Sequence, residues 1–169
     1  MAWKFRTVSP YSRTDNFFKL IDKDWLLVTA GTIKSFNTLT ASWGGIGILW
    51  ERKVAMCVIR PHRYTFEFME RSPAFSLSFF DEKYRKALKL CGKVSGRDID
   101  KVKAAGLTPI EGRKGGIYFD EARLVLECRK IYWHDFDPTH FIEPKLDVFY
   151  PDKDYHRLYV GEIVNCLVH

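Results

Sequence analysis

Short apolar runs separated by charged or turn-forming residues occupy the two ends of the chain. Residues 25–32 (WLLVTAGT) and 54–59 (VAMCVI) have the length and composition of buried strands. Residues 75–80 (FSLSFF) alternate apolar and polar side chains, and this period of two predicts a strand with one face inward. Residues 124–133 and 158–168 are longer and rich in β-branched or aromatic residues. Five or more strands at irregular spacing predict a barrel or a sandwich.

Helical patterns are confined to the middle of the chain. Residues 64–71 can form two turns, and residues 82–91 lie between a capping Asp81 and a terminating Gly92. A third short helix over residues 98–105 ends before another glycine. These helices do not alternate with the strands as a doubly wound parallel sheet requires. We therefore predict a mainly antiparallel barrel with a few short helices, and the lack of an internal repeat predicts a single domain.

Composition agrees with one packed domain. The chain has 169 residues, 46% of them hydrophobic and 15% aromatic, which is enough apolar material for a core and excludes a wholly disordered chain. The longest stretch without a charged residue, 35–50, is too short and too polar to span a bilayer. The first residues contain no apolar run with a small-residue cleavage site, so we expect no secretory signal and a cytoplasmic protein.

Charge and cysteine usage narrow the classes of partner. The net charge is +6, but the basic residues are interrupted by apolar and acidic ones instead of forming a stripe. Binding of single-stranded nucleic acid through exposed aromatic side chains is therefore a less favoured alternative. Cys57, Cys91, Cys128 and Cys166 lie more than thirty residues apart, without a C-x-x-C pair. This spacing argues against a zinc site or a disulfide framework and predicts reduced, mostly buried thiols.

A polar segment with three glycines is the first candidate binding site. Residues 37–47 (NTLTASWGGIG) place four hydrogen-bonding side chains within six residues, next to the flat surface of Trp43. The glycines allow a ligand to approach the backbone closely. Such a segment suits a flat polar ligand, and the alternative is a Ser/Thr-rich strand followed by a glycine turn.

Two basic segments at predicted helix starts are candidates for an anion site. In residues 60–65 (RPHRYT), Arg60 and Arg63 precede the N-terminus of a helix, whose unpaired N–H groups favour phosphate. The alternative is that both arginines are solvated or paired with nearby glutamates. Residues 91–101 (CGKVSGRDIDK) place further Lys, Arg and Ser side chains around a glycine turn, which is also an ordinary surface feature.

Histidines in the last third of the chain bear on a possible metal site. His134 and His140 lie near Asp135 and Asp137, and all four are metal-ligating residue types. Their spacing matches no metal-binding helix, and the segment contains a proline. We therefore expect no metal, and we interpret these imidazoles and that of His156 as ligand-contacting or exposed. The chain also lacks the G-x-S-x-G, Walker and G-x-G-x-x-G motifs.

Four segments, taken in order, carry a resemblance to a known family. The succession NTLTASW, RPHRYTFEF, FSLSFFDEKYRKALKLCGKVSGRDIDK and DYHRLYVGEIV resembles the flavin reductase-like family of FMN-binding split barrels, and in particular its flavoredoxin branch. The resemblance spans most of the chain, with residues 1–23 as an N-terminal arm. It implies a split β-barrel of Greek-key type over residues 1–169, FMN as the cofactor, and a cytoplasmic homodimer with the cofactor near the subunit interface.

The resemblance also implies which residues surround the cofactor. The NTLTASW segment would lie along the flavin ring and ribityl chain, and the RYT step would receive the phosphate. Many family members have Ser-x-Thr at that step, so Arg63 stands in place of a hydroxyl while Thr65 is kept. Lys101 would approach the flavin or its phosphate, and two histidines would lie near the ring. The implied cofactor-binding residues are Asn37, Thr38, Leu39, Thr40, Ser42, Trp43, Arg60, Arg63, Tyr64, Thr65, Cys91, Ser95, Lys101, His140 and His156.

The implied activity is NAD(P)H-dependent flavin reduction. NADH or NADPH would stack on the open face of the flavin and transfer hydride to its N5 atom, a step that needs orientation but no catalytic side chain. Electrons would then pass to free flavin, a metal chelate or a partner oxygenase. The alternative is a flavoredoxin-type carrier, which keeps FMN bound and exchanges electrons with redox proteins without efficient NAD(P)H oxidation.

Overall fold

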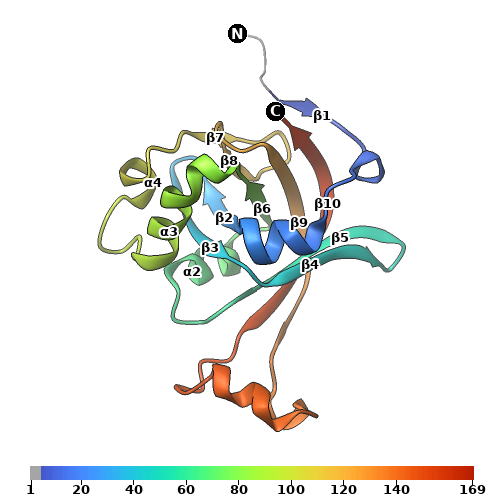
Figure 1. The fold of residues 1–169 in the computed structure, drawn as a ribbon, viewed down its shortest axis with the longest axis vertical. Coiled ribbons are helices and arrows are strands. Elements are labelled where there is room, and N and C mark those ends of the chain that lie inside the picture. Colours follow the sequence, from blue (N-terminus) through green and yellow to red (C-terminus); the bar gives the residue numbers. More distant parts are fainter. Residues whose placement is uncertain (1–4) are drawn as a thin grey trace.

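One antiparallel sheet forms the body of the protein. The computed structural model describes residues 5–169 (Figure 1). Within these residues the strands follow one another in the order β3-β2-β6-β9-β10-β5-β4, each neighbouring pair is antiparallel, and β1 pairs with β10. Two further strands, β7 and β8, pair only with each other. The strands are β1 (Arg6–Thr7), β2 (Leu26–Thr32), β3 (Ser35–Ala41), β4 (Gly44–Leu49), β5 (Arg52–Ile59), β6 (Ala74–Phe79), β7 (Pro109–Glu111), β8 (Ile117–Phe119), β9 (Leu124–Asp135) and β10 (Arg157–Val168).

The helices are short and lie outside the sheet (Figure 1). None of those in the described part of the chain is long and apolar enough to cross a membrane. This arrangement confirms the predicted mainly β fold with a few short helices. The helices are α1 (Phe17–Lys19), α2 (Tyr64–Arg71), α3 (Arg85–Lys93) and α4 (Lys101–Ala104), with 3-10 turns at Pro10–Ser12, Glu82–Tyr84, Pro138–His140 and Pro144–Phe149 and a π turn at Leu20–Asp24.

The sheet separates two apolar cores, and β6 shows why. All six residues of β6 are buried, although its sequence alternates apolar and polar side chains. Phe75, Leu77 and Phe79 pack into the core inside the barrel, with residues of β2, β9 and α2. The opposite face of the sheet carries Ser76 and Ser78 and is covered by a second core that includes residues of α3 and β8. A strand with one polar face is thus buried on both sides.

The sheet is open between its two edge strands, β3 and β4. These strands follow one another in sequence, and only Ser42 and Trp43 connect them. Gly44 begins β4 with φ of 146°, and a Cβ atom there would lie 2.2 Å from the carbonyl oxygen of Met56 on β5. The alternative interpretation of this segment is confirmed for the Ser/Thr-rich strand, which is β3, and is wrong for the glycine turn, because these glycines belong to β4. The open seam agrees with the predicted split barrel.

A segment between β9 and β10 projects from the barrel (Figure 1). This projecting segment, residues 136–156, contains two of the 3-10 turns and joins the two longest strands of the sheet. The strands pair up to the rung that joins Asp135 and Arg157. The segment therefore emerges from a fully paired part of the sheet.

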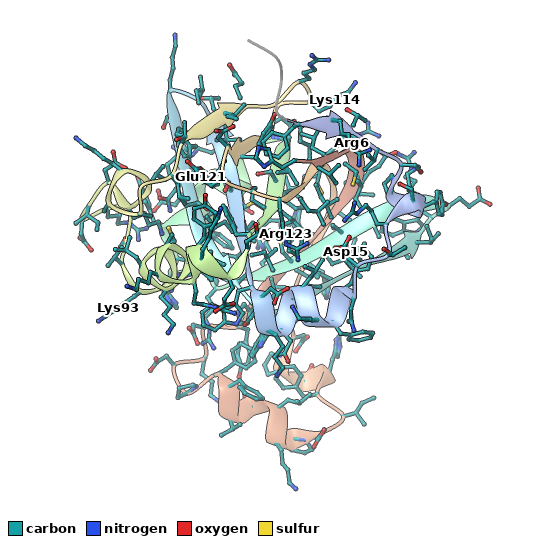
Figure 2. All side chains as sticks on the ribbon, turned by 45° about the horizontal axis from the view of Figure 1, so that its top comes forward. Arg6, Asp15, Lys93, Lys114, Glu121 and Arg123 are labelled. Carbon is teal, nitrogen blue, oxygen red and sulfur yellow. The ribbon has the colours of Figure 1, made fainter. Side chains whose placement is uncertain are left out.

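The N-terminal residues pack against the barrel through an ion pair and a buried side chain. Arg123, just before β9, lies 3.3 Å from Asp15, and Figure 2 shows the two labelled side chains close together. Leu20 is 2% exposed and belongs to the core inside the barrel. The first residues described, near β1, run along the end of β10.

The strands predicted over residues 54–59, 75–80, 124–133 and 158–168 differ from the structure by one or two residues at an end, and three other elements differ for a local reason. Trp25 has φ of 65° and ends the π turn, so β2 begins one residue later. The helix predicted from Glu82 begins as a 3-10 turn that Asp81 does not cap with its side chain, and α3 continues through Gly92. The helix predicted over residues 98–105 shortens to α4, because the Asp100 side chain caps it two residues later.

Candidate functional site

A cavity of about 230 Å³ lies where β3 passes into β4, beside the end of β5. Its walls come from segments far apart in sequence, namely the end of β3 and the connection to β4, the end of β5, the start of α2, the end of α3 and the start of β10. The split in the sheet thus opens directly into the cavity. The lining residues are Leu39, Thr40, Ala41, Ser42, Trp43, Val58, Ile59, Arg60, Arg63, Gly92 and His156.

The hydroxyl groups of β3 serve mainly to fasten this wall. The Thr40 hydroxyl donates to the carbonyl oxygen of Leu88 on α3. The Thr38 hydroxyl donates to the carbonyl oxygen of Val28 at 3.1 Å and lies 2.8 Å from the Thr29 hydroxyl, inside the protein. These bonds satisfy groups that would be unfavourable to bury alone, and they hold β3 against β2 and α3.

One end of the cavity presents the positive charge of Arg63, beside the start of α2. Arg63 precedes α2 and its side chain does not cap the helix. The backbone N–H groups of Tyr64 and Thr65 have no hydrogen-bond partner among residues 5–169. The Arg63 guanidinium donates to the carbonyl oxygen of Gly92 at 2.9 Å and pairs with no carboxylate of the described chain. Burial and the neighbouring charge of Arg60 lower the pKa of Arg63. This end of the cavity therefore favours an anion.

A buried hydrogen bond fixes the start of α2 against β3. The Asn37 side-chain amide donates to the Thr65 hydroxyl oxygen at 2.8 Å. Both side chains are buried, with Thr65 at 1% exposure. The Thr65 oxygen acts as the acceptor, so its own proton stays available for a second bond. Asn37 thus acts on the anion end through Thr65.

Another part of the cavity wall is aromatic. Trp43 is 42% exposed, and its ring centroid lies 5.3 Å from that of His156. The Nδ1 atom of His156 lies 2.8 Å from the Tyr150 hydroxyl of the projecting segment. Burial and the charge of Arg60 lower the pKa of His156 to about 4. His156 is therefore neutral at pH 7.

Arg60 joins the cavity to the projecting segment. Its guanidinium binds both carboxylate oxygens of Asp154 at 2.7 Å and donates to the carbonyl oxygen of Phe149 at 2.8 Å. His62 lies 3.2 Å from the same carboxylate. The charge of Arg60 is thus already balanced, whereas that of Arg63 is not.

Lys101 lies behind the cavity wall. Its side chain is 3% exposed and donates to the carbonyl oxygens of Cys91 at 3.1 Å and Val94 at 3.3 Å, at the end of α3. Burial lowers the pKa of Lys101 to about 8, with a further decrease from Arg63 and an opposing increase from the Cys91 thiol. Lys101 therefore stabilises the C-terminal turn of α3, the same turn whose Gly92 carbonyl accepts from Arg63.

Comparison with known proteins places this geometry in a family. The family model described as the flavin reductase like domain matches residues 21–169. The chain belongs to this family. A comparison with curated proteins gives no match.

Solved structures of flavin reductase-like proteins share the fold. An FMN-binding protein from Thermus thermophilus with bound p-hydroxybenzaldehyde is 21% identical, with a TM-score of 0.70 over 97% of this chain and 82% of that one. A flavoredoxin of Desulfovibrio vulgaris is 22% identical, with a TM-score of 0.68 over 97% and 77%. An NADH:FAD oxidoreductase from Streptomyces globisporus is 15% identical, with a TM-score of 0.66 over 97% and 87%. At these identities the similarity establishes the fold.

The structure brings about half of the predicted site residues of this flavin reductase-like chain to the cavity. Those that line it are Leu39, Thr40, Ser42, Trp43, Arg60, Arg63 and His156. The others do not line it: Asn37, Tyr64 and Lys101 line a separate cavity of about 550 Å³, Thr38, Thr65 and Cys91 are buried, and Ser95 lies on the loop after α3. His140 lies on a 3-10 turn of the projecting segment with 74% of its side chain exposed, and it does not line the cavity.

Four lining residues were not predicted. Ala41, Val58, Ile59 and Gly92 have no polar side chain, so their types gave no signal of a binding role. The position of Val58 and Ile59 directly before Arg60 was the available clue. Among the described residues no three His, Cys, Asp or Glu side chains come together in a group that could hold a metal ion.

Proposed function

We propose that the cavity binds FMN and that the protein is an NAD(P)H-dependent flavin reductase. The observation that carries this proposal is the polarity of the cavity. The wall combines the unbalanced guanidinium of Arg63, which precedes α2, with the aromatic surface of Trp43 and a neutral His156. A molecule with a phosphate tail and a flat ring matches both parts of this wall.

The residues present fit the parts of FMN one by one. Arg63 and the free N–H groups at the start of α2 suit the phosphate, because charge-assisted bonds are among the strongest hydrogen bonds in proteins. Ser42 lines the cavity, and its hydroxyl suits the hydroxylated chain. Apolar walls from Leu39, Val58 and the exposed face of Trp43 suit the ring.

The protein's part in the reaction is to bind and orient. When bound, FMN supplies the redox chemistry, accepting hydride from NADH or NADPH and passing electrons to an acceptor. Arg63 fixes the position of the ligand along the cavity, and Trp43 sets the plane of the ring. The neutral His156 adds no charge to the aromatic end. Hydride transfer between two stacked rings needs this orientation and no protein nucleophile.

The decisive experiment compares FMN with riboflavin, which lacks the phosphate. Arg63→Gln should weaken FMN binding by about 10-fold or more, because a charged hydrogen-bond partner of the phosphate is lost, and should leave riboflavin binding unchanged. Arg97→Gln is the matched control, since Arg97 is 46% exposed, bonds to Glu67 and does not line the cavity. Flavin fluorescence titration measures all six affinities. Equal loss of FMN and riboflavin affinity would contradict the phosphate assignment.

Anaerobic reduction distinguishes the enzyme from the carrier. The proposal expects that NADH or NADPH bleaches the flavin absorption of the FMN-loaded protein within seconds to minutes. A spectrum that persists with both donors but is bleached by a reduced redox protein would instead favour the flavoredoxin-type carrier. No flavin bands after addition of FMN would refute both functions.

We also infer a homodimer. Exposed apolar side chains lie on the edge strand β4, on the turn that follows it and on the projecting segment, including Ile48, Trp50, Ile142 and Val148. Such surface is typical of an interface, and these segments border the open seam. Light scattering during size-exclusion chromatography should give about twice the 19.8 kDa of one chain. A monomer at micromolar concentration would contradict the inference.

A further inference from the structure

A buried tyrosine of the projecting segment contacts the one histidine that lines the cavity. Tyr150 is 3% exposed and His156 is 8% exposed. The Tyr150 hydroxyl lies 2.8 Å from Nδ1 of His156. The Arg60 guanidinium lies over the Tyr150 ring, 5.1 Å from the ring centroid. The histidine ring packs against Trp43 and Phe136. The rings of Trp43, Phe136 and Tyr150 therefore surround the imidazole, and a hydrogen bond fixes its Nδ1 atom.

The hydrogen bond indicates which nitrogen carries the proton. A tyrosine hydroxyl has one proton, and the Tyr150 hydroxyl has no other acceptor among residues 5–169. If Nδ1 of His156 donated instead, the Tyr150 proton would be buried without a partner, which is unfavourable. The tyrosine therefore donates to Nδ1, and the proton of the neutral ring lies on Nε2.

The Nε2 atom is open to the cavity. Nε2 has no hydrogen-bond partner within the described chain. It is not an enclosed atom, because the Ser78 hydroxyl oxygen is the only enclosed side-chain polar atom of residues 5–169 that lacks a partner. Besides Tyr150, the charged and titratable groups that act on the ring are Arg60, His62 and Asp154, and Arg60 is paired with Asp154. The donor at Nε2 is thus neutral, accessible and next to the face of Trp43.

We propose that Tyr150 is a positioning residue that holds His156 in the Nε2–H tautomer, so that His156 donates a hydrogen bond to a carbonyl oxygen of a flat ring bound in the cavity. Phosphate is a poorer guest beside His156, because the charge of the neighbouring Arg60 is already paired with Asp154. The ligand half of this inference rests on the proposed function, with the flavin ring as the carbonyl-bearing group. The tautomer half concerns the protein alone.

The first test needs no ligand. Two-bond ¹H–¹⁵N NMR spectra of the histidine-labelled protein should show His156 as the Nε2–H form in the native chain. Tyr150→Phe should lower the ratio of the Nε2–H to the Nδ1–H form about fivefold, the factor that corresponds to the loss of one hydrogen bond. Tyr155→Phe is the matched control, since the Tyr155 hydroxyl donates to Asp147 and its ring contacts Tyr150. A Nδ1–H form in the native chain, or an unchanged spectrum in Tyr150→Phe, overturns the assignment.

The second test measures FMN affinity by flavin fluorescence. Tyr150→Phe should raise the Kd for FMN about two- to fivefold, and it should add nothing in a His156→Gln background, because the tyrosine acts through the histidine. Equal FMN affinity in Tyr150→Phe and the native chain overturns the ligand half. So does an additive effect in the double variant. If the native chain binds no FMN, the proposed function fails, whereas the NMR result still decides the tautomer.

Discussion

Thr65→Val removes the acceptor of the bond that ties α2 to β3. Valine keeps the shape of threonine, so the packing of the 1% exposed side chain should change little. The Asn37 amide, itself 6% exposed, would lose its partner at 2.8 Å. A buried donor left unsatisfied costs about 1–3 kcal/mol. We therefore expect the free energy of unfolding to fall by about 2 kcal/mol, which lowers Tm by roughly 4–8 °C in a chain of this size.

A double-mutant cycle makes the prediction specific to this hydrogen bond. Asn37→Leu removes the amide, and the variant with both substitutions replaces both partners by apolar groups. Its loss of stability should be smaller than the sum of the two single losses by about 1 kcal/mol. Urea denaturation at pH 7 measures all four chains, with Thr65→Ser as the control that keeps the hydroxyl. A Thr65→Val loss below about 0.5 kcal/mol, or strict additivity, would refute the reasoning.

Three other predictions concern the rest of the fold. Because the folded pKa of Lys101 is about 8, below the value of about 10.4 in an unfolded chain, the unfolded state binds the extra proton between these pH values. The stability of the native chain relative to Lys101→Met should therefore rise by about 2.5 kcal/mol from pH 8 to pH 10.4 in urea titrations, and a constant difference would contradict this. Gly161→Ala places a Cβ atom 2.6 Å from Phe75 and should cost about 1–3 kcal/mol, whereas Gly47→Ala, with open space around it, should cost little in the same denaturation assay. Burial raises the pKa of Cys57 to about 12, and all four cysteines are buried. A thiol reagent should therefore label none of them in the folded protein and all four in urea. Labelling of the folded protein would show that a thiol is accessible.

Local patterning was enough to predict the strands that carry the inner core. The alternation in residues 75–80 predicted β6, and the apolar runs predicted β2 and β5 within two residues. These strands are specified by their own side chains, because β2 and β5 are short apolar runs and β6 alternates with a period of two. The sequence also identified Trp43, Arg63 and His156, which lie together at the cavity although more than a hundred residues separate the first from the last.

The roles of β3 and Lys101 could not be predicted, because their partners are distant in sequence. The polar side chains of β3 suggested a ligand, yet Asn37 bonds to a residue 28 positions away and Thr40 to one 48 positions away. Lys101 suggested a phosphate contact, but it binds the end of α3. A hydrogen-bonding residue type predicts that a partner exists and does not say which one.

The two C-terminal histidines illustrate the same point. His140 and His156 both lie in polar, aromatic-rich sequence, and only the folded chain separates them. His156 precedes β10 and is covered by Trp43 and Tyr150, whereas His140 extends into solvent with the projecting segment. Burial of this kind depends on the topology of β9 and β10, which no local pattern encodes.

The projecting segment leaves the sheet at the paired residues Asp135 and Arg157, and this pairing allows the segment to be exchanged for another. Asp135 and Arg157 are directly paired there, and two hydrogen bonds of 2.6 and 2.7 Å join their side chains. The segment between these two residues can change in length or sequence while the register of β9 and β10 stays fixed. Since the segment supplies Tyr150 and Asp154, its exchange would alter the aromatic end of the cavity and leave the anion end intact. Evolution or design can thus vary ligand selection in this fold without rebuilding the barrel.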